Sequence, residues 1–475
     1  MKTLARILAL CLLLGGPARA AAPVGAADWR WVQGAVFVPT SAVNEAQQWD
    51  EYDPVVNARE LRFASVYGIN VVRVYLHYYV YLKKKEALLA DIEDFLAHAS
   101  RYGIRTEFVF FDDCWNQPPQ ALLTPGYRYP APIAGVHNSQ WLVCPGEEVR
   151  THYDLHRARL KAYVQDIVNA HKADARIAFW EIYNEPNKSE ATVRLERDAA
   201  AWIKETGTRI PSTATGGEFS GGPFSDFASW HMYGAYDLRG DAQSLCTECM
   251  NRQGQSVPGI VEHYRGKVGY IFWEFGIGRD NCRFPWENDH QHPRRDETPT
   301  PFHGIVYPDG HPWSLDDAKA LLGADGLARA PLFSVTYYRD DAFKSQAKRS
   351  VTPLIDFDLG DEPGTGSPDA SAGVPNEHYG IDYAGTFQAP AAGTYTLRVD
   401  TDGLVGLWIN GAAALEKRSA GRGTSTAEVP LAPGTSYTLH LRYVHGTGPS
   451  SLHLTWSGPG IAPQPLEPMP RGAGL

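Results

Sequence analysis

Eight short β-rich runs alternate with helical patterns up to about residue 325, and this order limits the fold more than any other feature of the chain. Helical periodicity is clearest in KKEALLADIEDFLAHASRYG and LHRARLKAYVQDIVNAHKA. A (β/α)8 barrel has this alternation, whereas an open doubly wound sheet more often stops at about five to seven strands. We therefore predict an α/β barrel with the strands WVQGAVFV (31–38), INVVRVYL (69–76), RTEFVFF (105–111), RIAFWEIY (176–183), STATGG (212–217), FASWHMY (227–233), AQSLCTE (242–248) and VGYIFWEF (268–275).

The composition of the chain changes after residue 328. Helical periodicity disappears, Gly, Pro, Thr and Ser become frequent, and short alternating strands follow at regular intervals: GTYTLRVD, GLVGLWING, TSYTLHLRYV and SLHLTWSG. This pattern is typical of an all-β sandwich. The sequence thus predicts a barrel domain over residues 21–328 and a β-sandwich domain over residues 329–475.

The N-terminus, MKTLARILALCLLLGGPARA, has a basic start, a short apolar run and a small-residue site ending at Ala20. These are the three parts of a secretory signal peptide, so we predict cleavage after Ala20 and export to the periplasm or the extracellular medium. The apolar run is too short to span a bilayer, and we expect no membrane insertion. The formal net charge is -10 without a basic stretch, which argues against nucleic acid as a partner.

The motif FWEIYNEPN, residues 179–187, carries the clearest chemistry. Pro186 ends the strand and leaves Glu185 at its carboxyl end, which is the active face of a barrel. Glycoside hydrolysis needs a carboxylic acid beside the leaving oxygen and a second carboxylate at the anomeric carbon, and Asn184 could bind the sugar 2-hydroxyl. Glu181 is a weaker candidate, because it lies roughly 13 Å further down the strand.

Two glutamates compete for the role of the second carboxylate. FWEFG, with Glu274, has the form of a catalytic strand end, but then only GIVY (304–307) would remain as an eighth strand. If CTE ends strand seven instead, VGYIFWEF becomes strand eight and Glu248 takes the role. Strand alternation agrees, because Trp273 facing the barrel axis would turn Glu274 outward. Glu248 is therefore the predicted nucleophile, and its charge should raise the pKa of a buried Glu185.

The barrel half resembles the clan A retaining glycosidases, in particular a cellulase- or xylanase-like branch of glycoside hydrolase family 5. The similar stretches are FVPTSAVNEAQQW, GINVVRVYLHYYV, FVFFDDCWN, GVHNSQW, IYNEPN, CTECM and FHGIVYPDG. The resemblance implies that Glu185 is the general acid/base and Glu248 the nucleophile. It also implies that Arg73 orients the nucleophile, that Tyr233 of the His231-x-Tyr233 pair bonds it, and that Trp273 occupies the family's strand-eight tryptophan position.

Further polar residues lie on the segments that carry this resemblance. They are candidates for sugar contacts or for loop scaffolding: His77, Asp113, His137 and Asn138. Most family 5 enzymes have a histidine near the end of strand three, whereas this chain continues into Asp112-Asp113. That departure leaves the identity of the sugar open. The tryptophans Trp115, Trp141 and Trp273 could stack on pyranose faces or belong to the core.

The C-terminal half resembles the protective-antigen-type carbohydrate-associated β-sandwich. The similar stretches are LFSVTYYRDDAF, LIDFDLGDEP, YGIDYAGTFQAPAAGTYTLRVDTDG, LWING and LTWSGPG. The resemblance implies a module that binds polysaccharide or forms one wall of the active cleft. Relatives often have paired aspartates where this chain has DTDG (400–403), so no calcium site is inferred.

Five cysteines remain after removal of the predicted signal peptide, and export favours disulfides. We expect a Cys114–Cys144 bond across the long third loop and a Cys249–Cys282 bond between strand seven and the loop after strand eight, which leaves Cys246 free. A zinc site from Cys246, Cys249, Cys282, His290 and His292 is the alternative, but Glu248 would lie inside it.

The expected protein is an exported retaining β-glycosidase that acts on a poly- or oligosaccharide without a metal or organic cofactor. Two alternatives share its residues. A non-catalytic polysaccharide-binding protein would keep the barrel without turnover, and a transglycosylase would use the same glutamates with water excluded.

Overall fold

The computed structural model describes residues 28–215, 224–288, 300–360 and 366–470. Its first half is the predicted (β/α)8 barrel, and the fold class is confirmed. All eight strands are parallel, in the order β5-β4-β3-β2-β1-β8-β7-β6. The strands are β1 Gln33–Val36, β2 Val71–Tyr75, β3 Arg105–Asp112, β4 Ile177–Asn184, β5 Ser212–Thr215, β6 Ser229–Met232, β7 Leu245–Cys249 and β8 Gly269–Phe272.

Side chains close the sheet where β5 and β6 meet as its two end strands. The hydroxyl of Ser229 on β6 lies 2.8 Å from that of Thr213 and 2.6 Å from that of Thr215, both on β5. These small polar residues allow the two strands to approach closely. The sheet is therefore a nearly closed barrel with a common carboxyl end.

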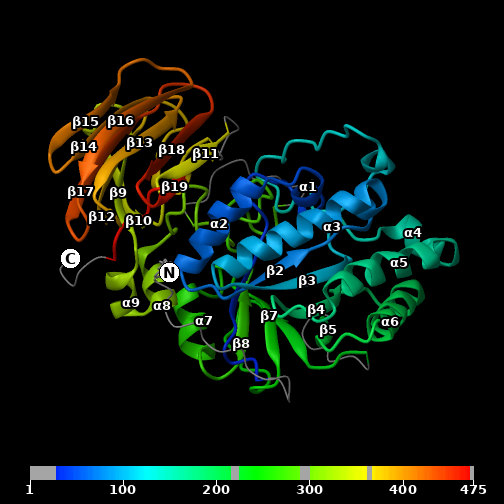
Figure 1. Ribbon diagram of the computed structural model, residues 1–475. Helices are drawn as coiled ribbons and strands as arrows, with labels where there is room; N and C mark the ends of the chain where they lie inside the picture. Colours follow the sequence, from blue (N-terminus) through cyan, green and yellow to red (C-terminus); the bar gives the residue numbers. More distant parts are fainter. Residues whose placement is uncertain (1–27, 216–223, 289–299, 361–365, 471–475) are drawn as a thin grey trace, which may run out of the picture.

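Helices cover the outside of the barrel (Figure 1). Several begin at side-chain caps that accept backbone N–H groups, as Asp53 does for α2, Ser189 for α6 and Ser256 for α7. The helices of both domains are α1 Glu45–Asp50, α2 Pro54–Val66, α3 Tyr78–Arg101, α4 Glu147–Thr151, α5 Tyr153–His171, α6 Glu190–Glu205, α7 Val257–Tyr264, α8 Leu315–Leu322 and α9 Ala324–Arg329, with 3-10 turns at Gln120–Leu123 and Ala370–Ala372.

Two apolar layers follow from the strand alternation. Residues such as Val71, Val109 and Ile271 fill the barrel interior, while Val72, Phe108 and other neighbours of opposite orientation pack between the sheet and the helices. Polar and charged residues take over the interior toward the carboxyl end of the strands, which is where the candidate site lies.

The C-terminal domain is the predicted all-β sandwich. A six-stranded sheet, β10-β9-β12-β17-β14-β15, packs on a five-stranded sheet of β11, β18, β13, β16 and β19, all antiparallel. The strands are β9 Phe333–Tyr338, β10 Gln346–Thr352, β11 Asp356–Leu359, β12 Gly380–Gln388, β13 Gly393–Thr401, β14 Leu404–Ile409, β15 Ala412–Lys417, β16 Gly423–Leu431, β17 Ser436–Val444, β18 Ser450–Gly458 and β19 Ile461–Pro465.

Ion pairs join the sandwich to the barrel, beside α2 and α8 (Figure 1). Arg62 on α2 donates two hydrogen bonds of 2.8 Å to Glu467. The fully buried Asp369 accepts from Lys348 at 2.6 Å and lies 3.2 Å from Nε2 of His311, a barrel-loop residue. The Asp369–His311 contact is buried and crosses the boundary, and the more exposed Arg62–Glu467 pair crosses it at the surface, so both contacts hold one domain against the other.

Neither predicted disulfide forms, since Cys114, Cys144, Cys249 and Cys282 are all free thiols, as is Cys246. Cys144 pairs with Asp112 through a β-bridge, and its Sγ donates outward to the Phe110 carbonyl, whereas Cys114 Sγ points to Glu185. Cys249 Sγ faces the carbonyl of Ile271 on the outer surface of β8. Each expected pair therefore has its two sulfurs pointing in different directions.

Three expectations fall partly on residues outside the described ranges. They are the signal peptide, residues 1–20, the alternative zinc set, through His290 and His292, and the predicted strand 212–217, through its last two residues. Within the described residues, none of the helices is both long and apolar enough to cross a membrane.

Candidate active site

Glu185 and Glu248 come together at the carboxyl end of the barrel. Glu185 directly follows β4 in the left-handed region, with φ of 43°, and its N–H donates to the Thr215 carbonyl at 2.7 Å. Glu248 lies within β7. Carboxylate oxygens of the two glutamates and a ring nitrogen of His231 all lie within 4.8 Å of one another. The Glu185 side chain is 37% exposed and that of Glu248 only 6%.

A bulge turns Glu248 into the barrel. Trp230 of β6 is level with Cys246 of β7, but the next residue, His231, is level with Glu248, so Thr247 is the extra residue. Without it, regular alternation would place Glu248 and Cys246 on the same, outward face. The bulge therefore allows Cys246 and Cys249 to join the outer core while Glu248 faces the site.

Three donors hold the carboxylate of Glu248. Oε1 accepts from Arg73 Nη1 at 2.6 Å and from the Tyr75 hydroxyl at 3.1 Å, and Oε2 accepts from the Tyr233 hydroxyl at 2.7 Å. Arg73 and Tyr75 share one face of β2, and Tyr233 follows β6. These contacts fix the rotamer of Glu248 and place the guanidinium of Arg73 against its carboxylate.

Arg73 is the centre of a buried charge network below the two glutamates. It donates to Glu181 at 2.7 and 2.8 Å, to Glu107 at 3.2 Å and to Asn184 at 2.8 Å. Burial strongly raises the pKa of Glu107, whereas for Glu181 the Arg73 charge outweighs burial and lowers the pKa. Glu107 is therefore the protonated member of this pair, and Glu181 supports Arg73 rather than contacting substrate.

Replacing Arg73 with methionine should destabilise the barrel by about 3–5 kcal/mol, because it leaves the charges of Glu181 and Glu248 buried without their cation. Equilibrium urea unfolding followed by fluorescence measures this effect. Arg194→Met is the matched control, since its partner Asp154 is at the surface, and it should cost less than about 1 kcal/mol. Equal losses in the two variants would contradict the role of Arg73.

His231 and Cys114 contact the carboxylate of Glu185. Nδ1 of His231 lies 2.6 Å from Oε1 of Glu185 and 3.3 Å from Glu248, and the Cys114 thiol donates to Oε2 at 3.3 Å. Burial would raise the pKa of Glu185, but the hydrogen bond and charge of His231 lower that pKa to about 2. The expected rise caused by Glu248 is thus wrong, because a cationic ring lies between the two carboxylates.

The lowered pKa of Glu185 is compatible with its predicted role as the acid if Glu185 and His231 share one proton. Burial lowers the pKa of His231, but the charge of Glu248 and the bond to Glu185 raise it above its ordinary value. The raised pKa of His231 favours a proton within the pair, and transfer of that proton across the 2.6 Å bond would give a protonated Glu185. The pair titrates as a unit, not as two separate groups.

Replacing His231 with asparagine should therefore move the basic limb of kcat/KM against pH to lower pH. Removing one of the two sites that bind the shared proton weakens proton binding by the pair. The test is the pH profile from pH 4 to 10 on an activated substrate, with His263→Asn, at an exposed position of α7, as the control. An unchanged basic limb would show that Glu185 holds its proton without help from the ring.

Asn184 and Asp112 form a second polar layer beside Glu185. Asn184 Nδ2 donates to Asp112 Oδ1 at 2.8 Å, and Trp141 Nε1 donates to Oδ2 at 2.8 Å. Burial outweighs these bonds and raises the pKa of Asp112 to about 7. Asp112 lies at the end of β3, where the resemblance to family 5 implies a histidine. In this protein it orients the amide of Asn184.

Four other predicted site residues have structural contacts away from the glutamate pair. His77 is fully buried, and its Nδ1 accepts from Tyr79 N as the cap of α3. Asp113 accepts from Tyr183, Asn187, Thr192 and Arg150, which anchors the loop after Glu185. His137 and Asn138 are buried in the third loop, where Nδ1 of His137 lies 2.5 Å from the Phe284 carbonyl.

Trp273 and Glu274 separate as strand alternation predicts. Trp273 belongs to the barrel interior, with its ring 5.4 Å from Trp141 and 6.0 Å from Tyr75. Glu274 instead lies in a fully buried group with Asp280 and Cys282, and burial strongly raises its pKa. Of the two competing glutamates, Glu248 is the one that lies beside Glu185.

An aromatic rim at the mouth of the site includes the predicted stacking candidate Trp115 together with Trp286 and His303, which the sequence did not mark. Trp286, 39% exposed, packs edge-on against Tyr233 at 5.0 Å, and Trp115, 45% exposed, lies 5.0 Å from the His137 ring. His303 lies between Trp286 and Trp273. Trp286 and His303 fall in irregular segments without strand or helix periodicity, so no sequence pattern marked them.

Three clusters in the described parts of the chain bring potential metal ligands within 4.8 Å of one another. One is the group of Glu185, His231 and Glu248, in which the oxygens of Glu248 already bond to Arg73 and Tyr233. The others are Glu274–Asp280–Cys282, which is buried, and Glu93–His171–Asp174, which lies at the surface.

Comparison with known proteins identifies the family of the C-terminal domain. Residues 332–468 match the PA14 domain family. Over 122 residues the chain is 30% identical to the anti-sigma-I factor RsgI3 of Acetivibrio thermocellus, a match that covers 26% of this chain and 18% of that protein. The chain thus spans less than a fifth of the length of this curated relative.

Solved structures with similar parts include other PA14 domains. The PA14 sugar-binding domain from RTX adhesin is 20% identical, with 30% of this chain and 98% of that chain covered and a TM-score of 0.25. An anti-sigma factor domain-containing protein from Clostridium clariflavum is 23% identical, with coverage of 30% and 47% and a TM-score of 0.27. The family match identifies the β-sandwich at the C-terminus of this chain as a PA14 domain.

Proposed function

We propose that the protein is a retaining β-glycoside hydrolase of the family 5 type that cleaves a poly- or oligosaccharide by double displacement. The observation that carries this proposal is the approach of the Glu185 and Glu248 carboxylates to within 4.8 Å at the carboxyl end of the barrel. Retaining enzymes have carboxyl groups about 5–5.5 Å apart, and inverting enzymes about 6.5–9.5 Å. The spacing supports direct attack rather than attack by an intervening water.

The roles follow from the contacts of each glutamate. Glu248, held by Arg73 and Tyr233, attacks the anomeric carbon with a carboxylate oxygen to form a glycosyl ester. Glu185 protonates the departing oxygen with the proton that it shares with His231. Glu185 then removes a proton from water, which cleaves the ester and releases the sugar with the configuration retained.

The surroundings also favour a carbohydrate. The exposed rings of Trp115 and Trp286 at the mouth suit stacking on pyranose faces. A PA14 domain follows the barrel, and one solved PA14 relative is described as sugar-binding. We further propose export, on the basis of the N-terminal basic, apolar and small-residue pattern.

The test is hydrolysis of a panel of aryl β-glycosides and β-linked polysaccharides, with the anomer of the first product followed by proton NMR. We expect the β-anomer first, followed by slow mutarotation. Initial release of the α-anomer would contradict the retaining mechanism. Binding without any cleavage on the whole panel would favour the non-catalytic polysaccharide-binding protein, and transfer to an added sugar in preference to water would favour the transglycosylase.

A further inference from the structure

A pocket of about 450 Å3 lies on the outer face of the six-stranded sheet of the PA14 domain, and its volume is within the usual range for ligand sites. Strands β14, β15 and β17 line it, and Gly406, Trp408, Glu416 and Arg442 are among its residues. The intervening residues of β14, such as Leu407, belong to the core of the sandwich. Figure 1 shows β14 and β15 on the side of the sandwich away from the barrel, so the pocket is separate from the site of the two glutamates.

A row of residues from neighbouring strands crosses this face of the sheet. Asp382 of β12 is level with Arg442 of β17, and Arg442 is level with Gly406 of β14. Gly406 is in turn level with Glu416 of β15. Because directly opposed residues point to the same face of a sheet, a basic and an acidic side chain lie on the two sides of a glycine. The glycine leaves room between them for a ring from another position.

The indole of Trp408 occupies this room. The far end of the indole lies over Gly406, where a Cβ would overlap the ring. The His440 ring, level with Trp408 on β17, stacks on the indole with 5.2 Å between centroids. Trp408 is nevertheless partly exposed, and its Nε1 has no hydrogen-bond partner within the described chain. The ring is therefore held in place, and it still offers apolar surface and one N–H donor to a ligand.

The charged side chains that line the pocket already have partners. Arg418 pairs with Glu416 at 2.7 Å, and Arg442 pairs with Asp382 at 3.1 Å. Nζ of Lys417 donates its three hydrogen bonds to the backbone carbonyls of residues 403, 419 and 421. Since each of these charges is already partnered, the pocket suits a neutral ligand better than an anion.

The paired groups keep hydrogen-bonding capacity for such a ligand. Arg442 uses only Nε for Asp382, which leaves its two Nη groups as donors. Glu416 uses only Oε2 for Arg418, which leaves Oε1 as an acceptor. Sugar hydroxyls both donate and accept, so they match this combination of donor and acceptor beside an aromatic ring.

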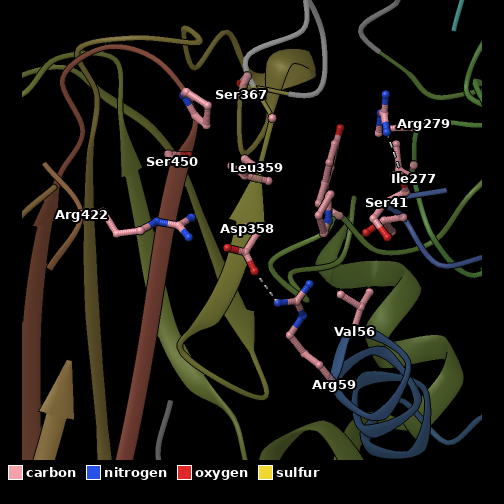
Figure 2. A pocket seen from close by; sticks show the side chains of 16 residues that line it. Ser41, Val56, Arg59, Ile277, Arg279, Asp358, Leu359, Ser367, Arg422 and Ser450 are labelled. Atoms are coloured by element: carbon pink, nitrogen blue, oxygen red, sulfur yellow. Dashed lines mark hydrogen bonds and ion pairs between the residues drawn. The ribbon is translucent and has the colours of Figure 1, made fainter. Parts of the chain in front are cut away.

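The pocket lies far from the contacts that attach the PA14 domain to the barrel. Figure 2 shows the cavity at the boundary of the two domains, where Arg59 of α2 lies 3.3 Å from Asp358 of β11. Strand β11 belongs to the five-stranded sheet, whereas the pocket lies on the six-stranded one. A long glycan held at the pocket would therefore stay attached to the protein without covering the domain boundary.

We propose that this pocket binds a neutral β-linked glycan, with a pyranose ring stacked on Trp408 and its hydroxyls bonded to Arg442 and Glu416. Attachment of a polymer at this second site would raise its effective concentration at the barrel. The choice of a β-linked glycan as the ligand rests on the proposed function, but binding is measurable without cleavage.

The test is calorimetric binding to the full chain carrying Glu248→Gln, with cellohexaose, xylohexaose and mannohexaose as probes. We expect at least one hexaose to bind. Addition of Trp408→Ala to the same chain should weaken one binding event about tenfold or more, because the stacking surface is lost. Circular dichroism and the melting temperature verify folding. No binding of any of the three hexaoses, or identical binding after Trp408→Ala, overturns the proposal.

Two further substitutions locate the site. Gly406→Ala places a methyl group where the indole lies, so it should weaken the same binding event although Trp408 remains. Arg442→Gln should also weaken that event, by about tenfold. Arg398→Gln is the matched control and should leave binding unchanged, because Arg398 pairs with Asp400 on the other sheet and does not line the pocket. Equal losses from Arg398→Gln and Arg442→Gln would overturn the site.

The same measurements separate this inference from the proposed function. Cleavage by the wild type without any binding event that depends on Trp408 would overturn only the PA14 site. A binding event that depends on Trp408, in a protein that cleaves nothing on the panel, would support the PA14 site and overturn only the hydrolase.

Discussion

Glu248→Gln should lower kcat by roughly 10⁴-fold or more on every substrate that the wild type cleaves. The amide preserves the shape of the side chain: its oxygen can still accept from Arg73 and its NH2 group can donate to the Tyr233 hydroxyl, but it cannot form the glycosyl ester. Initial rates on the best aryl glycoside of the panel measure the effect. Circular dichroism and the melting temperature verify that the variant is folded.

Glu274→Gln is the matched control for this experiment. Glu274 also follows a barrel strand, but it is buried beside Asp280 and Cys282, with no hydrogen-bond partner for either oxygen within the described residues. Its replacement should leave kcat within about threefold of the wild type. An inactive Glu274→Gln together with an active Glu248→Gln would contradict the assignment of Glu248 as the nucleophile and would favour Glu274.

Glu185→Ala should lower kcat by roughly 10²–10⁴-fold on substrates with poor leaving groups. The glycosidic oxygen of an oligosaccharide needs a proton before it can leave, whereas a dinitrophenolate leaves without one. The loss of kcat should therefore be much smaller on a dinitrophenyl glycoside. Azide should restore turnover on that substrate, because the alanine leaves room for an anion that needs no base.

The experiment compares rates on a natural oligosaccharide and on the dinitrophenyl glycoside, with and without azide. Glu190→Ala, at the exposed start of α6, is the control and should behave as wild type. An equal loss on both substrates without rescue by azide would contradict the acid/base role of Glu185.

The fold could be predicted from the sequence because it depends on patterns that extend over many residues. Each of the eight predicted runs overlaps one barrel strand; β3, β4 and β7 continue one residue past the predicted end, and β1, β6 and β8 are shorter than the runs because their ends turn into loops. The choice between Glu248 and Glu274 also depended on this strand count rather than on either local motif. The bulge at Thr247 was not predicted, yet it is what turns Glu248 inward.

Side-chain direction in the long loops could not be predicted. A histidine that caps a helix, as His77 does, has no local pattern that separates it from one that binds a sugar. The same is true of Asp113, which anchors the loop after β4. Cys114 and Cys144 flank one loop and suggested a disulfide, but the β-bridge at Asp112 sends one sulfur outward and leaves the other beside Glu185.

The electrostatics of Glu185 also depended on tertiary contacts. The sequence placed two carboxylates together and therefore indicated a raised pKa for the acid. The structure adds His231 between them, 2.6 Å from Glu185, and the pKa is lowered. The His231-x-Tyr233 pair marked this ring as a site residue, but its position between the two carboxylates follows from β6 lying beside β7.

Mass spectrometry of the enzyme after reaction with activated 2-deoxy-2-fluoro-β-glycosides tests the central claim most directly. The fluorine slows both the formation and the hydrolysis of the glycosyl ester, and the good leaving group restores the rate of formation. The glycosyl ester should therefore accumulate. We predict a mass increase of one fluoro-sugar, located by peptide sequencing on Glu248. A label on Glu274, or turnover without any covalent adduct, would contradict the mechanism.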